Sequence, residues 1–273
     1  MLGKKWIKTP KGNVTIAMVA YLILASIGSK TMMGIENGLI AVAVSLAVDY
    51  LYCSMTNRKG TRDGTVITGL IISLILSFTS SCMIVAGTAV MAILSKHLLV
   101  YKKKPIFNPA AVGLLLSIFI FHSEQSWWGA FGDLSPLTMI FLLIGGYVVT
   151  ERVNKFPQVF SFLGTFFVLL FLFGQVNMSA ASDAFRSPFI NAALFFGFFM
   201  LTDPPTSPAK HKDQVIFGFL TALSGVIVYA IFGGLTYLFI GLFVGNLYSN
   251  RIKAMKAVTQ RQNVKTPNRV FSK

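Results

Sequence analysis

Long apolar stretches alternate with short polar gaps along almost the whole chain. The stretches lie at about residues 13–31, 35–53, 64–80, 81–100, 108–121, 137–150, 158–175, 189–202, 214–232 and 234–250. A helix of about 20 mostly apolar residues can cross a bilayer, and most stretches approach that length. The pattern therefore predicts an all-α integral membrane protein with ten transmembrane helices. The membrane domain covers residues 1–250, and residues 251–273 form a basic tail.

Positively charged residues are concentrated in every second gap between these stretches. If the N-terminus is placed on side one, all Lys and Arg residues except Lys30 and Arg186 fall on that side. Because cytoplasmic loops of membrane proteins are enriched in Lys and Arg, we expect both termini to be cytoplasmic. A wrong helix count would scramble the alternation, so the charges also support the number ten.

Composition agrees with a multi-pass protein of the plasma membrane. The chain is 54% hydrophobic and 12% charged, and it contains 25 Phe, which lies outside the usual range for a soluble domain. A net charge of +15 can indicate nucleic acid binding. Cytoplasmic loops beside anionic lipid explain it more simply, so the bilayer is the expected partner and nucleic acid is not.

Segments five helices apart show weak similarity. Residues 112–117 and 244–249 agree at several positions, and residues 76–80 resemble residues 201–207. Five is an odd number, so matched helices would run in opposite directions through the bilayer. This is the pattern of an inverted repeat, with halves at about 13–121 and 137–250 and a binding site between them.

Proline interrupts the apolar runs at two of these places. Asn108-Pro109 begins one short run, and Asp203-Pro204 ends another. Irregular backbone at membrane depth requires surrounding protein or a watery cavity. Such breaks indicate a binding site, although they could also be ordinary helix ends at the surface.

Ionisable residues inside the apolar stretches are few. Asp49, Lys96 and His97 lie near cytoplasmic ends, so Lys96 is expected to reach the interface and Asp49 to pair with a basic loop. Cys53 and Cys82 are expected at opposite faces as small apolar fillers without a disulfide. The chain has no nucleotide-binding loop, nucleophile elbow or metal-spaced His/Cys cluster. We therefore predict no catalytic residue and no metal site, and expect any reactive group to come from a cofactor or another subunit.

The loop after the fifth stretch is rich in aromatic residues. Trp127 and Trp128 are interpreted as anchors at the membrane interface. Beside Gly129 and Gly132 they could instead stack on a planar ligand.

Three motifs now carry a resemblance to a known family. The chain is similar to the RnfD/NqrB family of membrane subunits of ion-translocating redox complexes at Phe107-Asn108-Pro109-Ala110, at Ser135-Pro136-Leu137 and at Met200-Leu201-Thr202-Asp203-Pro204-Pro205-Thr206-Ser207-Pro208. Thr68-Gly69-Leu70 and Gly218 also fit. The resemblance covers roughly residues 40–250 and implies a ten-helix 5+5 bundle. It makes Thr68, Asn108 and Asp203 candidate cofactor-binding residues.

The resemblance also implies a flavin, either flavin mononucleotide or riboflavin. Family members attach flavin mononucleotide to a Thr in a Ser-Gly-Ala-Thr-Pro-Leu stretch of this loop, where Ser135 stands here. Asp133 and Leu134 replace the small Gly-Ala pair, and a carboxylate near the acceptor repels the incoming phosphate. We therefore expect any flavin to be non-covalent, bound in the bundle or beside Trp127, Trp128 and Ser135, and we expect Ser135 to stay unmodified.

Two function classes remain open from the sequence. The first is a membrane subunit of a flavin-linked electron-transfer complex that moves Na⁺ or H⁺, which requires other redox subunits and is not catalytic alone. The second is a stand-alone transporter or channel for a small solute, because inverted 5+5 bundles also build solute pathways.

Overall fold

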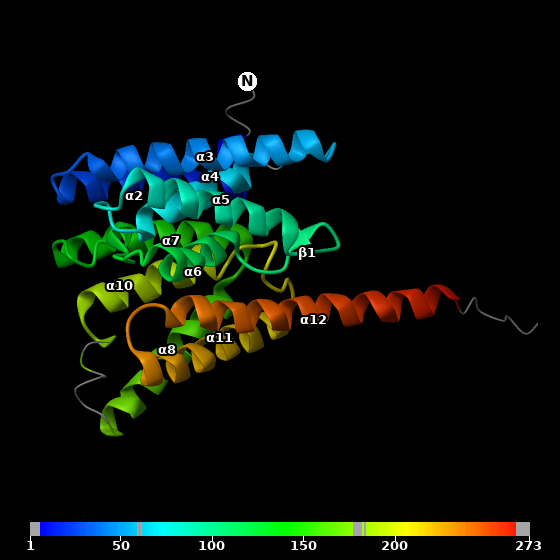
Figure 1. The fold of residues 1–273 in the computed structure, drawn as a ribbon. Coiled ribbons are helices and arrows are strands. Elements are labelled where there is room, and N and C mark those ends of the chain that lie inside the picture. The colour runs from blue at the N-terminus through cyan, green and yellow to red at the C-terminus, as the bar shows by residue number, and fades with distance from the viewer. Residues whose placement is uncertain (1–5, 59, 61, 177–181, 183, 266–273) are drawn as a thin grey trace, which may run out of the picture.

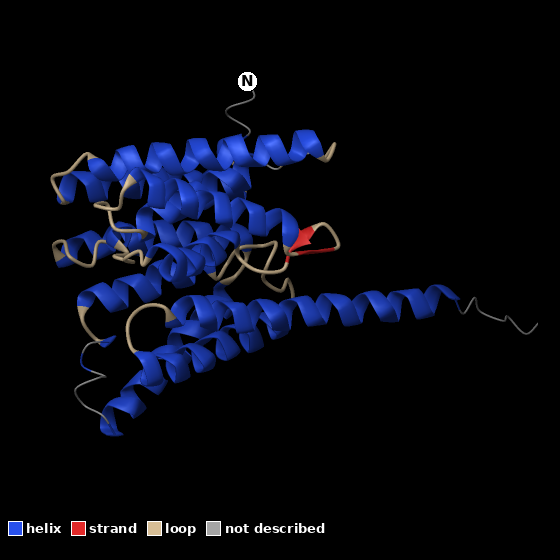
Figure 2. Ribbon diagram, viewed as in Figure 1, coloured by secondary structure: helices blue, strands red, loops and turns tan. Residues whose placement is uncertain are grey.

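The fold is a bundle of helices with one short hairpin (Figures 1 and 2). A computed structural model describes residues 6–58, 60, 62–176, 182 and 184–265. Its main helices are α2 (Pro10–Gly28), α3 (Met33–Met55), α4 (Arg62–Ile75), α5 (Cys82–Leu98), α6 (Pro109–Phe121), α7 (Met139–Val153), α8 (Phe156–Val176), α10 (Ser187–Phe195), α11 (His211–Phe232) and α12 (Tyr237–Lys265). Short pieces are the strands β1 (Val100–Tyr101) and β2 (Lys104–Pro105), the 3₁₀ turns η1 (Trp128–Ala130) and η2 (Pro136–Thr138), and the π-helical turn η3 (Phe196–Met200).

Each predicted apolar stretch overlaps one of these helices, so the all-α prediction is confirmed. Within the described residues, five helices are long and apolar enough to cross a bilayer by length and composition, namely Pro10–Gly28, Met33–Met55, Pro136–Val153, Phe156–Gln175 and His211–Phe232. Cys82–Leu98, Pro109–Phe121 and Ser187–Met200 are apolar but shorter. These helices make the chain a multi-pass membrane protein, while ten complete crossings stay a prediction.

The helix packing of the first half recurs in the second. Helix α3 packs against α5 as α8 packs against α11, and α5 packs against α6 as α11 packs against α12. In the same way α2 contacts α4, and α7 contacts α10 and η3. Each of these pairs occupies equivalent places in the two predicted halves. The pairing supports the inverted repeat, which itself stays a prediction.

In both halves, a side-chain amide donates hydrogen bonds to carbonyl oxygens just beyond the end of a broken helix. The Asn37 amide of α3 donates to the carbonyl oxygens of Phe78 (3.0 Å) and Ser80 (3.3 Å), just after α4. The Gln158 amide of α8 donates to Leu201 O (2.5 Å), just after η3. Carbonyls beyond a helix end have no partner in the helix and are costly to bury unpaired. An amide near the start of the second helix of each half removes that cost.

The predicted stretch 64–80 is helical only as far as Ile75. Leu76 pairs with Gln125 of the loop that follows α6, and the chain then turns, with Ser80 N–H donating to Ser77 O (2.9 Å). Ser77 N–H donates to Glu124 O (3.2 Å), and Trp127 N–H donates to Ile75 O (3.0 Å). The apolar pattern could not show this break, because Leu76 and Phe78 are as apolar as the residues of the preceding buried helix.

Helix α12 passes through the boundary predicted at residue 250. It continues to Lys265 and extends well beyond the neighbouring helices in Figure 1. At about 1.5 Å per residue, a helix of 29 residues is longer than the roughly 30 Å hydrocarbon core. The basic tail from 251 stays a prediction, and residues 251–265 of it continue the helix without a break. Residues 266–273 lie outside the described residues.

Candidate functional site

A cavity of about 500 Å³ lies where the two halves meet. Of the residues predicted to bind a cofactor, Thr68, Asn108 and Asp203 all line it. Its other lining residues are Pro10, Lys11, Val14, Gly64, Ile67, Ile71, Lys96, Lys103, Lys104, Pro105, Pro109, Ala110, Val149, Val153, Phe199, Thr202, Pro204 and Pro205. Those lining residues that lie at helix ends or in the gaps between the predicted stretches all fall on side one, the side that carries nearly all Lys and Arg residues. The cavity therefore opens toward the basic end of the bundle.

Asn108 joins three elements at the floor of the cavity. Pro109 opens α6, where its missing N–H costs nothing, and Asn108 is the N-cap with its Oδ1 accepting from Ala111 N–H (3.2 Å). The Asn108 N–H donates to Asn246 Oδ1 of α12 (3.0 Å), and its Nδ2 donates to Met200 O at the end of η3 (3.4 Å). The break predicted at Asn108-Pro109 is thus buried in protein between the halves.

The loop after η3 carries Asp203 and is held by donors from elsewhere in the chain. Its prolines supply no N–H groups. The Asn246 amide donates to Thr206 O (3.4 Å), Lys253 Nζ to Pro205 O (2.8 Å), and Lys155 Nζ to Pro208 O. Lys155 is buried, and this desolvation, with a smaller contribution from Lys253, lowers the pKa of its ammonium to about 8. The loop is therefore fixed by contacts that no local sequence pattern shows.

Asp203 places a carboxylate at the cavity wall. Its Oδ2 accepts a hydrogen bond from the Thr206 hydroxyl (2.9 Å), and its main-chain oxygen accepts from Ser207 N–H (3.0 Å). Burial raises the pKa of this carboxyl, while the Thr206 hydrogen bond and Lys253 act in the opposite direction. On the opposite wall, Thr68 is buried and its hydroxyl donates to Gly64 O (2.9 Å). The cavity thus combines a carboxylate, an amide and a hydroxyl with apolar walls.

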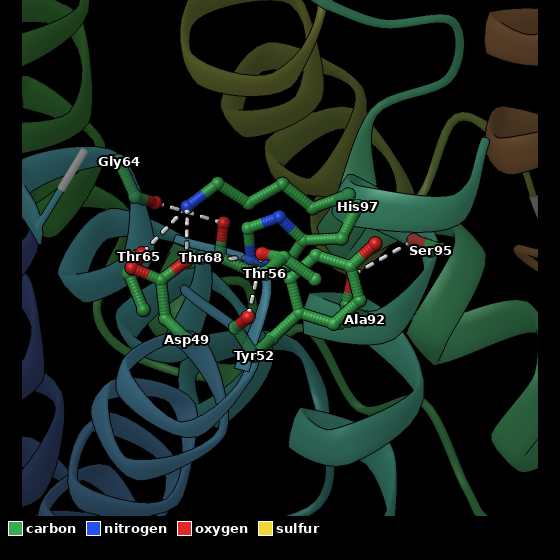
Figure 3. A network of polar contacts seen from close by, with 10 residues as sticks. Asp49, Tyr52, Thr56, Gly64, Thr65, Thr68, Ala92, Ser95 and His97 are labelled. Carbon is green, nitrogen blue, oxygen red and sulfur yellow. Dashed lines mark hydrogen bonds and ion pairs between the residues drawn. The ribbon is translucent and has the colours of Figure 1, made fainter. Parts of the chain in front are cut away.

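Lys96 connects the cavity to a polar network between α3, α4 and α5 (Figure 3). Its Nζ lies 2.9 Å from Asp49 Oδ1 and 2.6 Å from the Thr65 hydroxyl oxygen. His97 Nε2 lies 2.8 Å from the same Asp49 oxygen. The prediction that Lys96 reaches the interface and Asp49 pairs with a basic loop was therefore wrong. The two charges pair with each other because α3 and α5 pack side by side.

Trp127, Trp128 and Ser135, which were predicted to form a site on the outer face, do not come together in one site. Trp127 and Trp128 are 2% and 5% exposed. Trp127 stacks on Phe239 (5.6 Å between ring centroids), and Trp128 Nε1–H donates to Ser73 O (2.7 Å). Ser135 is exposed. Interpreting the tryptophans as interface anchors was wrong, because their loop enters the bundle and their rings pack against protein. Their proposed stacking on a ligand at Ser135 has no support in this packing.

Two important residues of the cavity were not among the candidates predicted from the sequence. Phe199 supplies its only aromatic side chain among the described lining residues, and Lys96 supplies a cation that is mostly buried. Phe199 was hidden in a run of apolar residues. Lys96 was visible as a charge inside an apolar stretch, which is a signal of function.

Comparison with known proteins agrees with this arrangement. A sequence model of the family described as NQR2, RnfD, RnfE matches residues 3–138 and 127–256, a division close to the boundary between the predicted halves. The RnfD subunit of the ion-translocating oxidoreductase complex of Colwellia psychrerythraea is 29% identical over 91 residues. The matched segment is 33% of this chain and 25% of that relative, so only a quarter of the relative's length is matched. The family matches cover most of the chain, and the chain belongs to the NQR2, RnfD, RnfE family.

Proposed function

We propose that this chain is a membrane subunit of an ion-translocating oxidoreductase complex. The observation that carries the proposal is the convergence of two family motifs, those of Asn108-Pro109 and Asp203-Pro204, on one cavity between the halves, where Thr68 of a further matching segment also lies. The relative in Colwellia psychrerythraea is a subunit of such a complex by name. Nothing among the described residues of the cavity resembles a site for oxidising a soluble substrate alone, so other membrane redox subunits are the expected partners.

We further propose that the cavity holds a flavin non-covalently. Its volume of about 500 Å³ lies in the range of pockets for ligands of this size, roughly 300–1,000 Å³. Ile67, Ile71 and Phe199 offer apolar surface for a planar ring, and Thr68 and Asn108 offer polar atoms for its edge. Lys103 and Lys104 at the exposed end favour a ligand with a phosphate. When bound, the flavin supplies the electron-carrying chemistry, and these residues bind and orient it.

The cavity is a better place for a flavin than the outer loop. Ser135 is exposed, and the tryptophan rings near it in sequence are packed in the protein core. Asp133 is exposed two residues away and repels a phosphate. Ser135 is therefore expected to remain unmodified.

A cavity-filling variant tests the flavin proposal. Val14→Trp adds a large side chain to the wall supplied by α2 and should lower the flavin content of purified protein at least tenfold. Ser135→Ala is the matched control and should keep the flavin content unchanged. Absorbance of the purified protein measures total flavin, and acid precipitation then releases only the non-covalent part. Retention in Val14→Trp with loss in Ser135→Ala would place the flavin on the outer loop instead.

Asp203 is the residue we propose to carry the coupled ion. It is a carboxylate in the cavity wall, and burial raises its pKa, so it can hold a proton or attract Na⁺ beside the ligand. Asp203→Asn should abolish redox-driven uptake of Na⁺ or H⁺ into vesicles while the flavin stays bound. Ion uptake at the wild-type rate in Asp203→Asn would remove this residue from the path.

We propose that both termini face the cytoplasm of a plasma membrane. The two cysteines provide a test without engineered sites, because Cys82 is exposed and lies at the end of the bundle opposite the cavity. A membrane-impermeant maleimide added outside intact cells should label the wild-type protein. Cys82→Ser should remove this labelling, and Cys53→Ser should keep it. The reverse pattern would invert the topology.

A further inference from the structure

A cluster of three metal-ligating side chains lies at the basic end of α3 and α5. Asp49 and Cys53 are one turn apart on α3, and His97 is at the end of α5. One ligand atom of each residue lies within 4.8 Å of the others. This cluster was not predicted from the sequence, because a pattern of apolar helices does not show which helix ends pack together. The proposed flavin and ion sites make no use of Cys53 or His97.

The surroundings hold these side chains in place. The Tyr52 ring stacks on the His97 ring with centroids 4.2 Å apart and planes 16° from parallel (Figure 3). Gly60 covers the other side, where an added Cβ would lie 2.7 Å from Asp49 Oδ2 and 3.0 Å from Cys53 Sγ. The backbone after α3 can therefore approach both ligand atoms only because residue 60 has no side chain.

We propose that Asp49, Cys53 and His97 bind a divalent transition-metal ion of the Zn²⁺ type. Carboxylate oxygen, thiolate sulfur and imidazole nitrogen are the usual ligands of Zn²⁺, with bonds of about 2.0–2.3 Å. On binding, the Cys53 thiol loses its proton to solvent, and His97 ligates through Nε2 with its remaining proton on Nδ1. The carboxylate and the thiolate then neutralise the ion, and water takes the fourth position.

The ligand spacing requires only a small adjustment. In a tetrahedral site, neighbouring ligand atoms lie about 3.3–3.7 Å apart, given these bond lengths. Asp49 Oδ1 and His97 Nε2 are 2.8 Å apart, so they separate by about half an ångström. Cys53 is half-buried, and its thiol moves toward the pair. The metal ion ties the end of α3 to the end of α5.

Lys96 competes with the metal ion. Its ammonium lies 2.9 Å from Asp49 Oδ1 with the metal absent, and Arg58 is a second nearby cation. Metal binding repels the ammonium from Asp49. The ammonium of Lys96 can then keep its contact with the Thr65 hydroxyl or turn into the cavity. Removal of this cation should therefore strengthen metal binding.

Metal titration of the purified full-length protein tests the site. Co²⁺ serves as the spectroscopic probe, and we expect one thiolate-to-cobalt charge-transfer band per chain. Zn²⁺ should displace it. Cys53→Ser should remove the band and weaken Zn²⁺ binding by about 100-fold, which is the upper range for the loss of an outer-shell partner of a metal ligand and hence a minimum for a ligand itself. The matched control Cys82→Ser should keep both, and Lys96→Met should tighten Zn²⁺ binding about tenfold.

A second measurement uses the wild-type protein alone. Zn²⁺ should slow the reaction of Cys53 with a small maleimide and leave the reaction of Cys82 unchanged. Equal effects on both cysteines, or a cobalt spectrum without thiolate character, would overturn the proposal. So would wild-type Zn²⁺ affinity in a folded Cys53→Ser protein.

Discussion

Replacing Asn108 tests whether the two halves depend on one side chain at the cavity floor. Asn108→Ala removes the Oδ1 that caps α6 and the Nδ2 that donates to Met200 O (3.4 Å). The main-chain N–H of residue 108 still donates to Asn246 Oδ1, because the substitution leaves the backbone unchanged. The variant therefore separates the side-chain contribution from that of the neighbouring backbone contact.

The expected loss follows from the two contacts. Removing an Asn N-cap costs about 1 kcal/mol. Losing a donor to a buried carbonyl costs about 1–3 kcal/mol, and Met200 O lies at the low end because the lost bond is long (3.4 Å) and the Asp203 N–H still donates to it (3.5 Å). Asn108→Ala should therefore lower the free energy of unfolding by about 2 kcal/mol. Asn108→Ser keeps a capping oxygen but cannot reach Met200 O, so it should lose about 1 kcal/mol.

Unfolding by SDS in mixed micelles, followed by tryptophan fluorescence, measures these differences. Asn13→Ala is the matched control, because Asn13 is half-buried and its amide bonds only within its own helix, to Thr9 O. It should change stability by less than about 0.5 kcal/mol. The reasoning fails if Asn108→Ala matches Asn13→Ala, or if Asn108→Ser is as unstable as Asn108→Ala.

Three further substitutions probe other parts of the bundle. Trp128→Phe leaves Ser73 O without its donor and should cost about 1–3 kcal/mol in the same assay, whereas an interface anchor would cost little. The pKa of Lys155 is about 8 in the folded protein, below the ordinary 10.5, so the unfolded state binds more protons between these two values. Stability should therefore rise with pH across pH 8–10.5. Lys155→Met should flatten that rise when melting is measured as a function of pH. Gly113→Ala places a Cβ 2.6 Å from a side chain of α5 and should destabilise the protein by about 1–3 kcal/mol. The control Gly164→Ala places a Cβ with nothing within 4 Å and should not destabilise it, so equal melting temperatures would contradict the close packing of α5 and α6.

The helices were largely predictable because their cause is local. A run of apolar residues with charged ends forms a helix in a bilayer almost regardless of its neighbours, since every backbone group must be satisfied within the segment. The exceptions lie where that rule is relaxed. Residues 76–80 are not helical, and the loop at Gln125 and the Asn37 amide supply backbone partners to this segment. Both partners are distant in sequence, so no local pattern shows them.

The candidate site was predictable in part for the same reason. Asn108-Pro109 and Asp203-Pro204 mark breaks that the chain itself displays, and both line the cavity. Lys96 was assigned to the surface because the sequence shows only that it lies near a helix end. Its pairing with Asp49 depends on how the helices pack, which the sequence does not show. The tryptophans were assigned to the membrane interface because composition reports an environment only on average.

Purification of the tagged chain from its native membranes tests the central proposal most directly. The proposal predicts that other membrane redox subunits co-purify, and that acid precipitation releases about one flavin per chain. It also predicts that the remaining polypeptide has its unmodified mass. A colourless protein without redox partners that moves a solute in liposomes on its own would contradict the proposal and establish a stand-alone transporter.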